Sequence, residues 1–315
     1  MRLSRVTVFL CVVAASLLAA GPASASQALT ELNVRLISFN VNKKGEALVS
    51  YQRSDGYVRH VFAWGAINAR PPTKDVPQIQ FKWDFAGGWK KYRDAQAWKK
   101  FKGACRRYDG PKLALLVAAC KAPDGTYWTL QAWQRRLPLL GFDPWLPHQT
   151  AWELHLAHFS GELPVLEVYP NWTYDMSWQG IFGRFTYLGQ PIHGFATTNT
   201  GNPKDKYGRN VFIDTYNSAY GPGWKREAGI VTHVGTGTFC HSFVPVRPFP
   251  GYPSMDMRPA APGEYERVTV MGPGVTPVIR TEVKGLTAAD RGRDDEFNTV
   301  FDSVMTGDRI CAHER

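Results

Sequence analysis

The chain lacks the local motifs by which many enzymes are recognised. It contains no His-Glu-x-x-His zinc motif, no Gly-x-Ser-x-Gly nucleophile turn, no Gly-x-x-x-x-Gly-Lys phosphate-binding loop and no EF-hand loop. It also has no Cys-x-x-Cys spacing, and His155 and His158 stand three apart, which places them on opposite faces of a strand. These absences argue against the corresponding nucleotide, zinc and serine-hydrolase chemistries, and we expect neither a cofactor nor a bound metal.

Long apolar runs are missing everywhere except at the N-terminus. Arg2 and Arg5 precede a 15-residue apolar run that ends at Ala20, and the small residues Ala23-Ser24-Ala25 follow it. This order of a basic, an apolar and a small-residue region predicts a secretory signal peptide over residues 1–25, cleaved after Ala25. No later run approaches the ~18 apolar residues of a membrane span. We therefore expect an extracellular protein without a membrane span.

Cysteine is scarce, and its count fits an oxidising compartment. The sequence has five cysteines, of which Cys11 lies in the predicted signal peptide. An even set of four remains, which in an exported protein predicts two disulfides. Three pairings are possible; we favour Cys105 with Cys120 because they are close in sequence, and Cys240 with Cys311 then follows by elimination.

Acidic residues are outnumbered by basic ones, 27 to 37, and the excess is concentrated in one segment. Removal of residues 1–25, which hold two arginines and no acid, lowers the formal net charge from +10 to +8. Residues 89–107 alone carry eight basic side chains against the single acid Asp94. A charge of this sign favours an anionic partner or surface.

Aromatic rings alternate with the charges of this segment. Trp89, Lys90 and Lys91 stand at its start, and Trp98 and Lys99 near its middle. Rings beside cations suit stacking on sugars or bases and contact with charged polymers, so these five residues are candidate binding residues. The alternative is structural: the rings pack into the core as one face of a helix, and the lysines are simply solvated.

The rest of the chain is a series of short alternating runs separated by turn residues. The clearest hairpins are 47–64, which turns at Asp55-Gly56, and 115–133, which turns at Pro123-Asp124-Gly125. Further runs lie at 152–169, 182–196, 211–216, 238–244 and 265–271. Because strands and helices do not alternate, the pattern predicts a mainly β protein, an antiparallel β-sandwich or open barrel.

Two helices are expected beside the strands. Asp94 and Gly103 fit the start and end of a short helix near 94–102. An amphipathic helix near 294–305 begins with acidic residues and carries apolar residues at the i, i+3, i+4, i+7 spacing, which should dock on a sheet. The members of this apolar stripe are Phe297, Val300, Phe301 and Val304.

A proline-rich stretch at 138–147 is the best candidate boundary between two parts of the chain. It would separate an N-terminal β subdomain, 26–137, from a C-terminal β subdomain with the closing helix, 148–315. Each part would then hold one disulfide. One continuous domain over 26–315 fits the pattern almost as well.

A polar cluster is expected on one hairpin. If 153–159 pairs with 163–169, Glu153 faces Tyr169 and His155 faces Glu167, while the leucines share the opposite face. Two carboxylates about 5 Å apart and an imidazole could perform acid–base catalysis, as in a glycosidase. The alternative is the solvated face of an amphipathic hairpin.

A second candidate is a carboxylate framed by rings. Asp214 shares a strand face with Phe212 and Tyr216, and Trp224 follows in the next turn. Rings that stack on the C–H face of a sugar, beside an acid that takes its hydroxyls, are typical of sugar recognition. The structural alternative is an aspartate held by backbone donors at the end of a strand.

Three segments carry a resemblance to known proteins. Residues 120–135 (CKAPDGTYWTLQAWQR), 220–224 (YGPGW) and 232–240 (THVGTGTFC) resemble segments of an uncharacterised family of secreted actinobacterial proteins. That family has no established activity, so the resemblance implies export and assigns no functional residue.

Together these patterns predict a secreted, disulfide-stabilised β protein. We expect it to bind a polysaccharide or an anionic polymer of the cell envelope or environment rather than nucleic acid. An extracellular glycan hydrolase, with Glu153 and Glu167 as acid and base and His155 orienting them, is the alternative. The sequence carries no indication of an oligomeric state.

Overall fold

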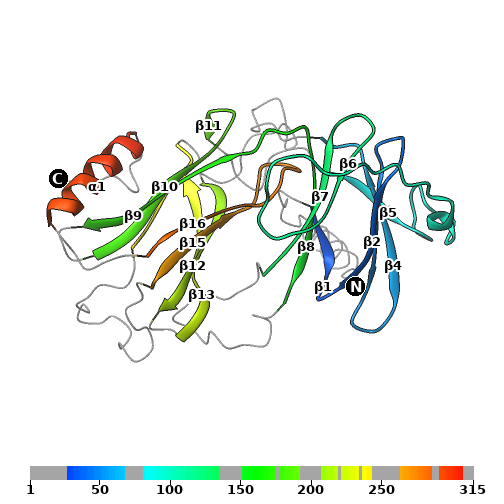
Figure 1. Ribbon diagram of the computed structural model, residues 1–315, viewed down its shortest axis with the longest axis horizontal. Helices are drawn as coiled ribbons and strands as arrows, with labels where there is room; N and C mark the ends of the chain where they lie inside the picture. Colours follow the sequence, from blue (N-terminus) through cyan, green and yellow to red (C-terminus); the bar gives the residue numbers. More distant parts are fainter. Residues whose placement is uncertain are drawn as a thin grey trace, which may run out of the picture.

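The computed structural model describes residues 27–67, 81–134, 151–174, 178–191, 207–218, 221–233, 236–242, 263–285 and 291–307. It is a mainly β protein, as the sequence predicts, and the strands of these residues form four antiparallel sheets. The sheets pack in pairs, so that two β-sandwiches lie side by side (Figure 1). The predicted signal peptide, the proline-rich stretch and Cys311 fall outside the described residues.

The first sandwich holds the N-terminal strands. One of its sheets has the order β1-β8-β7-β6 and the other the order β2-β3-β4-β5. Leu154, Leu156 and Leu130 of the first sheet pack against Val49 and Val61 of the second, in one apolar core. The strands are β1 (Gln27–Leu32), β2 (Arg35–Val41), β3 (Ala47–Gln52), β4 (Val58–Trp64), β5 (Lys82–Phe85), β6 (Leu116–Lys121), β7 (Tyr127–Trp133) and β8 (Glu153–Phe159).

The second sandwich holds the remaining strands. One sheet has the order β13-β12-β15-β16; in the other, β10 pairs with β9, β11 and β14. Ile213 and Val268 of the first sheet share a buried core with Phe185 and Phe239 of the second. The strands are β9 (Val165–Tyr174), β10 (Trp178–Tyr187), β11 (Gln190–Pro191), β12 (Tyr207–Ser218), β13 (Gly221–His233), β14 (Thr238–Ser242), β15 (Tyr265–Val270) and β16 (Ile279–Lys284).

The two clearest predicted hairpins are confirmed. β3 pairs with β4 and β6 with β7, and at the turns Gly56 and Gly125 adopt positive φ angles of 83° and 91°. Residues with a Cβ rarely adopt this conformation, so each glycine fixes the turn and with it the register of the hairpin.

The predicted C-terminal helix is confirmed as α1 (Arg291–Val304). Phe301 is fully buried against Phe182 of β10, and Val300 and Val304 pack beside it. The predicted helix at 94–102 is shorter than expected: only Ala97–Lys100 forms a turn of 3-10 helix, η1, and Phe101 is already extended. Trp98 packs on His60 and Phe101 on Phe62. One short helical turn is enough to bring both rings onto the first sandwich.

The predicted hairpin at 152–169 is wrong. β8 pairs with β7 and β1, whereas β9 pairs with β10 in the other sandwich. Every residue of β8 is buried, because one face lies in the first core and His155 on the other face contacts Trp133, which packs against Phe212 of the second sandwich. The sheet of the first sandwich thus continues across the predicted boundary at 138–147, and the division into two subdomains stays a prediction.

The connection between β15 and β16 joins the two sandwiches. Residues 271–278 are all buried, and Val275 reaches the core of the first sandwich. The Val275 carbonyl accepts a hydrogen bond of 2.9 Å from the backbone N–H of His158, and the Gln131 side chain makes two hydrogen bonds, 2.8 and 2.9 Å, with the backbone of Val278. These bonds satisfy backbone groups that burial would otherwise leave without partners.

The favoured disulfide between Cys105 and Cys120 is confirmed; it ties the segment after η1 to β6. Cys240 is also disulfide-bonded. Its pairing with Cys311 stays a prediction because that residue lies outside the described part of the chain.

His158 is a buried histidine that holds three segments together. Its Nδ1 lies 2.6 Å from the Ala66 carbonyl, its Nε2 lies 2.8 Å from the Thr126 hydroxyl, and its ring stacks on Trp128. Because a carbonyl can only accept, Nδ1 carries the proton and donates it. Burial lowers the pKa of His158 from 6.5 to about 4, so the ring is neutral at pH 7.

We expect His158 to make the protein less stable in acid. Between pH 6.5 and 4 the unfolded chain binds a proton that the folded chain does not, so the free energy of unfolding should fall by about 3 kcal/mol as the pH drops through this window. Urea unfolding at pH 7 and pH 4.5 measures this fall, and His158→Gln should remove most of it. Equal pH dependence in the wild type and the variant would contradict the assignment.

Candidate functional site

The candidate site is an open pocket in the first sandwich, with a volume of about 580 Å³. Three parts of the chain line it: the turn between β2 and β3, Phe62 of β4, and the basic segment from Lys91 to Gly103. Only the last of these is predicted from the sequence as a binding segment. The Lys43-Lys44-Gly45 turn is visible in the sequence as a turn, but nothing local connects it with residues 50 positions away.

Asn42 shapes the turn that carries two of the lysines. Its side-chain carbonyl accepts hydrogen bonds from the backbone N–H groups of Lys44 and Glu46, at 2.8 and 3.1 Å. Its Nδ2 donates to the Glu46 carboxylate at 2.8 Å. This arrangement holds the turn in one conformation and places Lys43 and Lys44 at the rim of the pocket.

Aromatic rings form the floor of the pocket. Phe62 is fully buried, and the Tyr92 ring stacks on it at 3.7 Å between centroids, with Phe101 at 6.0 Å. Trp64 meets Tyr92 edge to face at 5.7 Å. Tightly packed rings give the pocket a rigid apolar base.

Lysines dominate the rim, and the two acids among them are already paired. Lys91 forms an ion pair with Glu46, and Lys100 with Asp94 at 2.9 Å. Although burial by itself raises the pKa of Glu46, hydrogen bonds from Lys91 and Asn42 lower it below its usual value. Glu46 is therefore ionised and its charge is compensated.

Three further lysines line the pocket. Lys43, Lys44 and Lys102 have no ion pair with any carboxylate in the described ranges. The pocket therefore presents a net positive charge next to an aromatic floor. This combination suits an anionic group carried on a ring-shaped apolar body.

A rigid loop beside the pocket exposes Trp89. The buried carboxylate of Asp84 accepts hydrogen bonds from the backbone N–H groups of Phe85, Lys90 and Tyr92, at 2.9–3.0 Å. The Trp89 side chain, two residues before Lys91, is 88% exposed. A tryptophan so exposed on an ordered loop is available to a ligand without prior rearrangement.

The other candidates in the basic segment divide into exposed and packed side chains. Lys90 is exposed, with its ammonium 5.7 Å from the centre of the Trp83 ring. Trp98 is half-buried and stacks on His60 at 4.2 Å, so the structural alternative describes its ring better. Lys99 is exposed beside it and does not line the pocket.

The predicted catalytic cluster is not assembled. Glu153 and His155 lie buried on β8, with 3.1 Å between Oε2 and Nε2. Glu167 lies on β9 in the other sandwich and forms an ion pair of 2.8 Å with Arg184 of β10. The proposed pair of Glu153 and Glu167 depended on a hairpin that does not form, because β8 and β9 have other partners.

Tyr169 also belongs to the second sandwich. Its ring stacks on Phe182 at 5.2 Å and packs in the apolar cluster under α1. We therefore assign it a packing role. In the described ranges no group of three or more His, Cys, Asp or Glu side chains could hold a metal ion.

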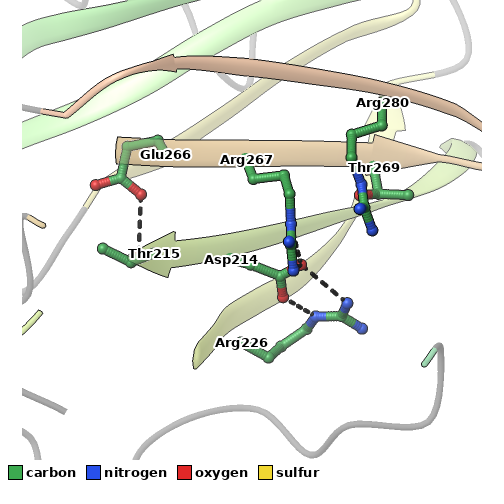
Figure 2. A network of polar contacts seen from close by, with 7 residues as sticks. All are labelled: Asp214, Thr215, Arg226, Glu266, Arg267, Thr269 and Arg280. Carbon is green, nitrogen blue, oxygen red and sulfur yellow. Dashed lines mark hydrogen bonds and ion pairs between the residues drawn. The ribbon is translucent and has the colours of Figure 1, made fainter. Parts of the chain in front are cut away.

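Asp214 is buried in a network of arginines rather than open to a ligand (Figure 2). Its carboxylate accepts two hydrogen bonds from Arg226 of β13, at 2.5 and 3.2 Å, and is 3.0 Å from Arg267 of β15. Burial by itself raises the pKa of Asp214, but the two arginines outweigh burial and lower it. The predicted role in taking sugar hydroxyls is therefore not supported by the geometry.

Arg280 extends this network. Its Nε donates to the Thr269 hydroxyl at 3.2 Å, and burial together with the nearby charge of Arg267 lowers its pKa to about 10 (Figure 2). On the other face of the same sheet, burial raises the pKa of Glu266 to about 8 despite a hydrogen bond from Thr215. The network is thus a set of largely buried ion pairs and hydrogen bonds that connects the strands of the sheet β13-β12-β15-β16.

Comparison of the chain with protein-family models, with curated proteins and with solved structures gives no match. Within the described ranges, no helix combines the length and the apolar character that a membrane crossing requires.

Removal of the Asp214 carboxylate should be strongly destabilising. Asp214→Ala leaves two guanidinium groups buried without their counter-charge, and loss of one partner of a buried pair typically costs about 3–5 kcal/mol. Chemical unfolding measures the loss. The control is Asp55→Asn, which removes the exposed charge paired with Arg53 but keeps the side-chain oxygen that accepts a hydrogen bond from the Tyr57 backbone N–H; it should cost less than about 1 kcal/mol. Similar small losses in both variants would contradict a structural role for Asp214.

Proposed function

We propose that this chain is a secreted binding protein that holds an acidic polysaccharide in the lysine-rimmed pocket. One observation carries the proposal: Lys43, Lys44 and Lys102, with no ion pair in the described ranges, surround a floor of packed aromatic rings. Acidic groups of the polymer would meet the lysines, and a sugar ring would lie over the floor.

The surroundings of the pocket support a polymer rather than a small isolated anion. Trp89 is held on the neighbouring loop with its ring in solvent, where it could stack on the next sugar along the chain. Stacking of a ring on an aromatic side chain depends on its C–H face, not on its charge. Lysine contacts and stacking together favour a uronic-acid or sulfated glycan.

A secreted location belongs to the same proposal. The disulfide between Cys105 and Cys120 is compatible with an oxidising compartment. If residues 1–25 are a signal peptide, the protein recovered from the culture medium of an expressing bacterium should begin at Ser26. N-terminal sequencing of the exported protein tests this; a full-length chain retained in the cytoplasm would contradict it.

Polymer binding should weaken when the free lysines lose their charge. We expect Lys43→Gln/Lys44→Gln/Lys102→Gln to bind polygalacturonate at least tenfold more weakly than the wild type in 50 mM salt. We also expect added salt to lower the affinity of the wild type more steeply than that of this variant, because the wild type makes more charged contacts, which salt screens and whose formation releases bound counterions. Isothermal titration calorimetry at three salt concentrations measures both effects.

The matched control removes three charges elsewhere. Arg35, Lys82 and Lys112 are exposed and do not line the pocket, so the corresponding triple glutamine variant has the same net charge as the pocket variant. It should bind almost as the wild type does. An equal loss in both triple variants would assign the effect to net charge, and no loss in either would refute the pocket as the site.

A further inference from the structure

Three aromatic side chains form a row across the second sandwich, which we call the aromatic row: Trp224, Tyr216 and Tyr265. Tyr216 of β12 is in register with Trp224 of β13 on one side and with Tyr265 of β15 on the other. Residues directly opposite each other in antiparallel strands point to the same face of the sheet. The ring centroids are 5.1 and 6.3 Å apart, so the three rings make one continuous strip.

The aromatic row is accessible at the surface. Tyr265 is 49% exposed, and Trp224 and Tyr216 are half-buried. Alternation along β12 sends Val211 and Ile213 into the apolar core and Tyr216 to the opposite face, away from that core. The guanidinium of Arg267 lies over one face of the Trp224 ring, 4.0 Å from its centre, and holds the ring in place.

Positive charge accompanies the aromatic row on the same face. Lys284 of β16 is in register with Tyr265 and continues the row. In the neighbouring register, Asp214 is opposite both Arg226 and Arg267, and Glu282 is opposite Arg267. Asp214 is compensated by its two arginines, so the side chains that set the charge beside the row are Lys284 and Arg280 against Glu282.

We propose that the aromatic row is a second binding surface for an acidic polysaccharide, with sugar rings stacked along it and their acidic groups facing Lys284. The continuous strip of rings and the positive charge of Lys284 and Arg280 beside it fit such a chain better than a neutral one. The class of ligand rests on the proposed function, whereas the surface does not include any residue of the pocket.

The aromatic row and the pocket lie in different sandwiches, so the length of the ligand should affect binding. The strands β12, β13 and β15 belong to the second sandwich, whereas the segments that line the pocket belong to the first, on the other side of the molecule (Figure 1). A long polymer can contact both surfaces of one protein molecule, but a short oligosaccharide can contact only one. Linked sites raise the overall affinity for the long ligand without any new contact.

The test compares a short and a long form of one ligand. Tyr265→Ala and, separately, Trp224→Leu should weaken binding of the galacturonate hexamer about tenfold in the background of the pocket variant Lys43→Gln/Lys44→Gln/Lys102→Gln, where only the row is left. This factor corresponds to about 1.4 kcal/mol, within the range for one stacked ring. Trp224→Phe, which retains a ring, should restore most of the affinity, whereas a purely structural role would show as a lowered melting temperature in Trp224→Leu.

Two comparisons make the outcome decisive. Tyr57, 59% exposed on the turn after β3, provides the control: Tyr57→Ala should change nothing. For long polygalacturonate and the otherwise wild-type protein, Tyr265→Ala should lower the affinity and the number of bound sugar units.

If the pocket variant binds no hexamer and Tyr265→Ala leaves polymer binding unchanged, the aromatic row is refuted and the pocket stands. If the pocket variant loses nothing but Tyr265→Ala does, the pocket is refuted and the row stands. Tighter binding of single-stranded DNA than of polygalacturonate to the row would also overturn the assignment.

Discussion

The buried backbone of residues 271–278 is the constraint on which the rest of the structure depends. A connection between two strands usually runs over the surface, where water satisfies its polar groups. Here it lies between two sandwiches, so its N–H and C=O groups need partners within the protein. Gln131 supplies both a donor and an acceptor to Val278, and the β8 backbone supplies a donor to Val275. These bonds fix how β7 and β8 meet the second sandwich.

The contact between the two sandwiches determines which polar residues are accessible to a ligand. Because both faces of β8 are covered, Glu153 and His155 are internal, and Asp214 is internal for a similar reason on β12. Trp133 packs against Phe212, and the Arg226 guanidinium lies 5.8 Å from the centre of the Trp133 ring. Polar groups that could serve catalysis in an open cleft serve instead to join two apolar layers. Exposed lysines and rings remain elsewhere, at the pocket of the first sandwich and at Tyr265 of the second.

Local patterns predicted the strands well but not their partners. The hairpins closed by Gly56 and Gly125 follow from turn chemistry within a few residues, and the stripe of α1 follows from helical spacing. The alternation within β8 was also correct, with Leu154 and Leu156 on the core face. The predicted pairing of β8 with 163–169 was wrong, because alternation indicates which residues share a face but not which distant strand pairs with them. Part of the pocket was predicted in the same limited way, through the segment with Lys91, but not the turn with Lys43.

The sequence by itself determined the fold class, the turns, the C-terminal helix and the disulfide of Cys105, because each depends on residues close together along the chain. Only the tertiary structure decided the burial of Asp214, the separation of Glu153 from Glu167 and the presence of Lys43 and Phe101 in one pocket. The physical reason is that burial and charge compensation depend on contacts between segments far apart in sequence. Such contacts are selected by the packing of whole sheets, which no local spacing records.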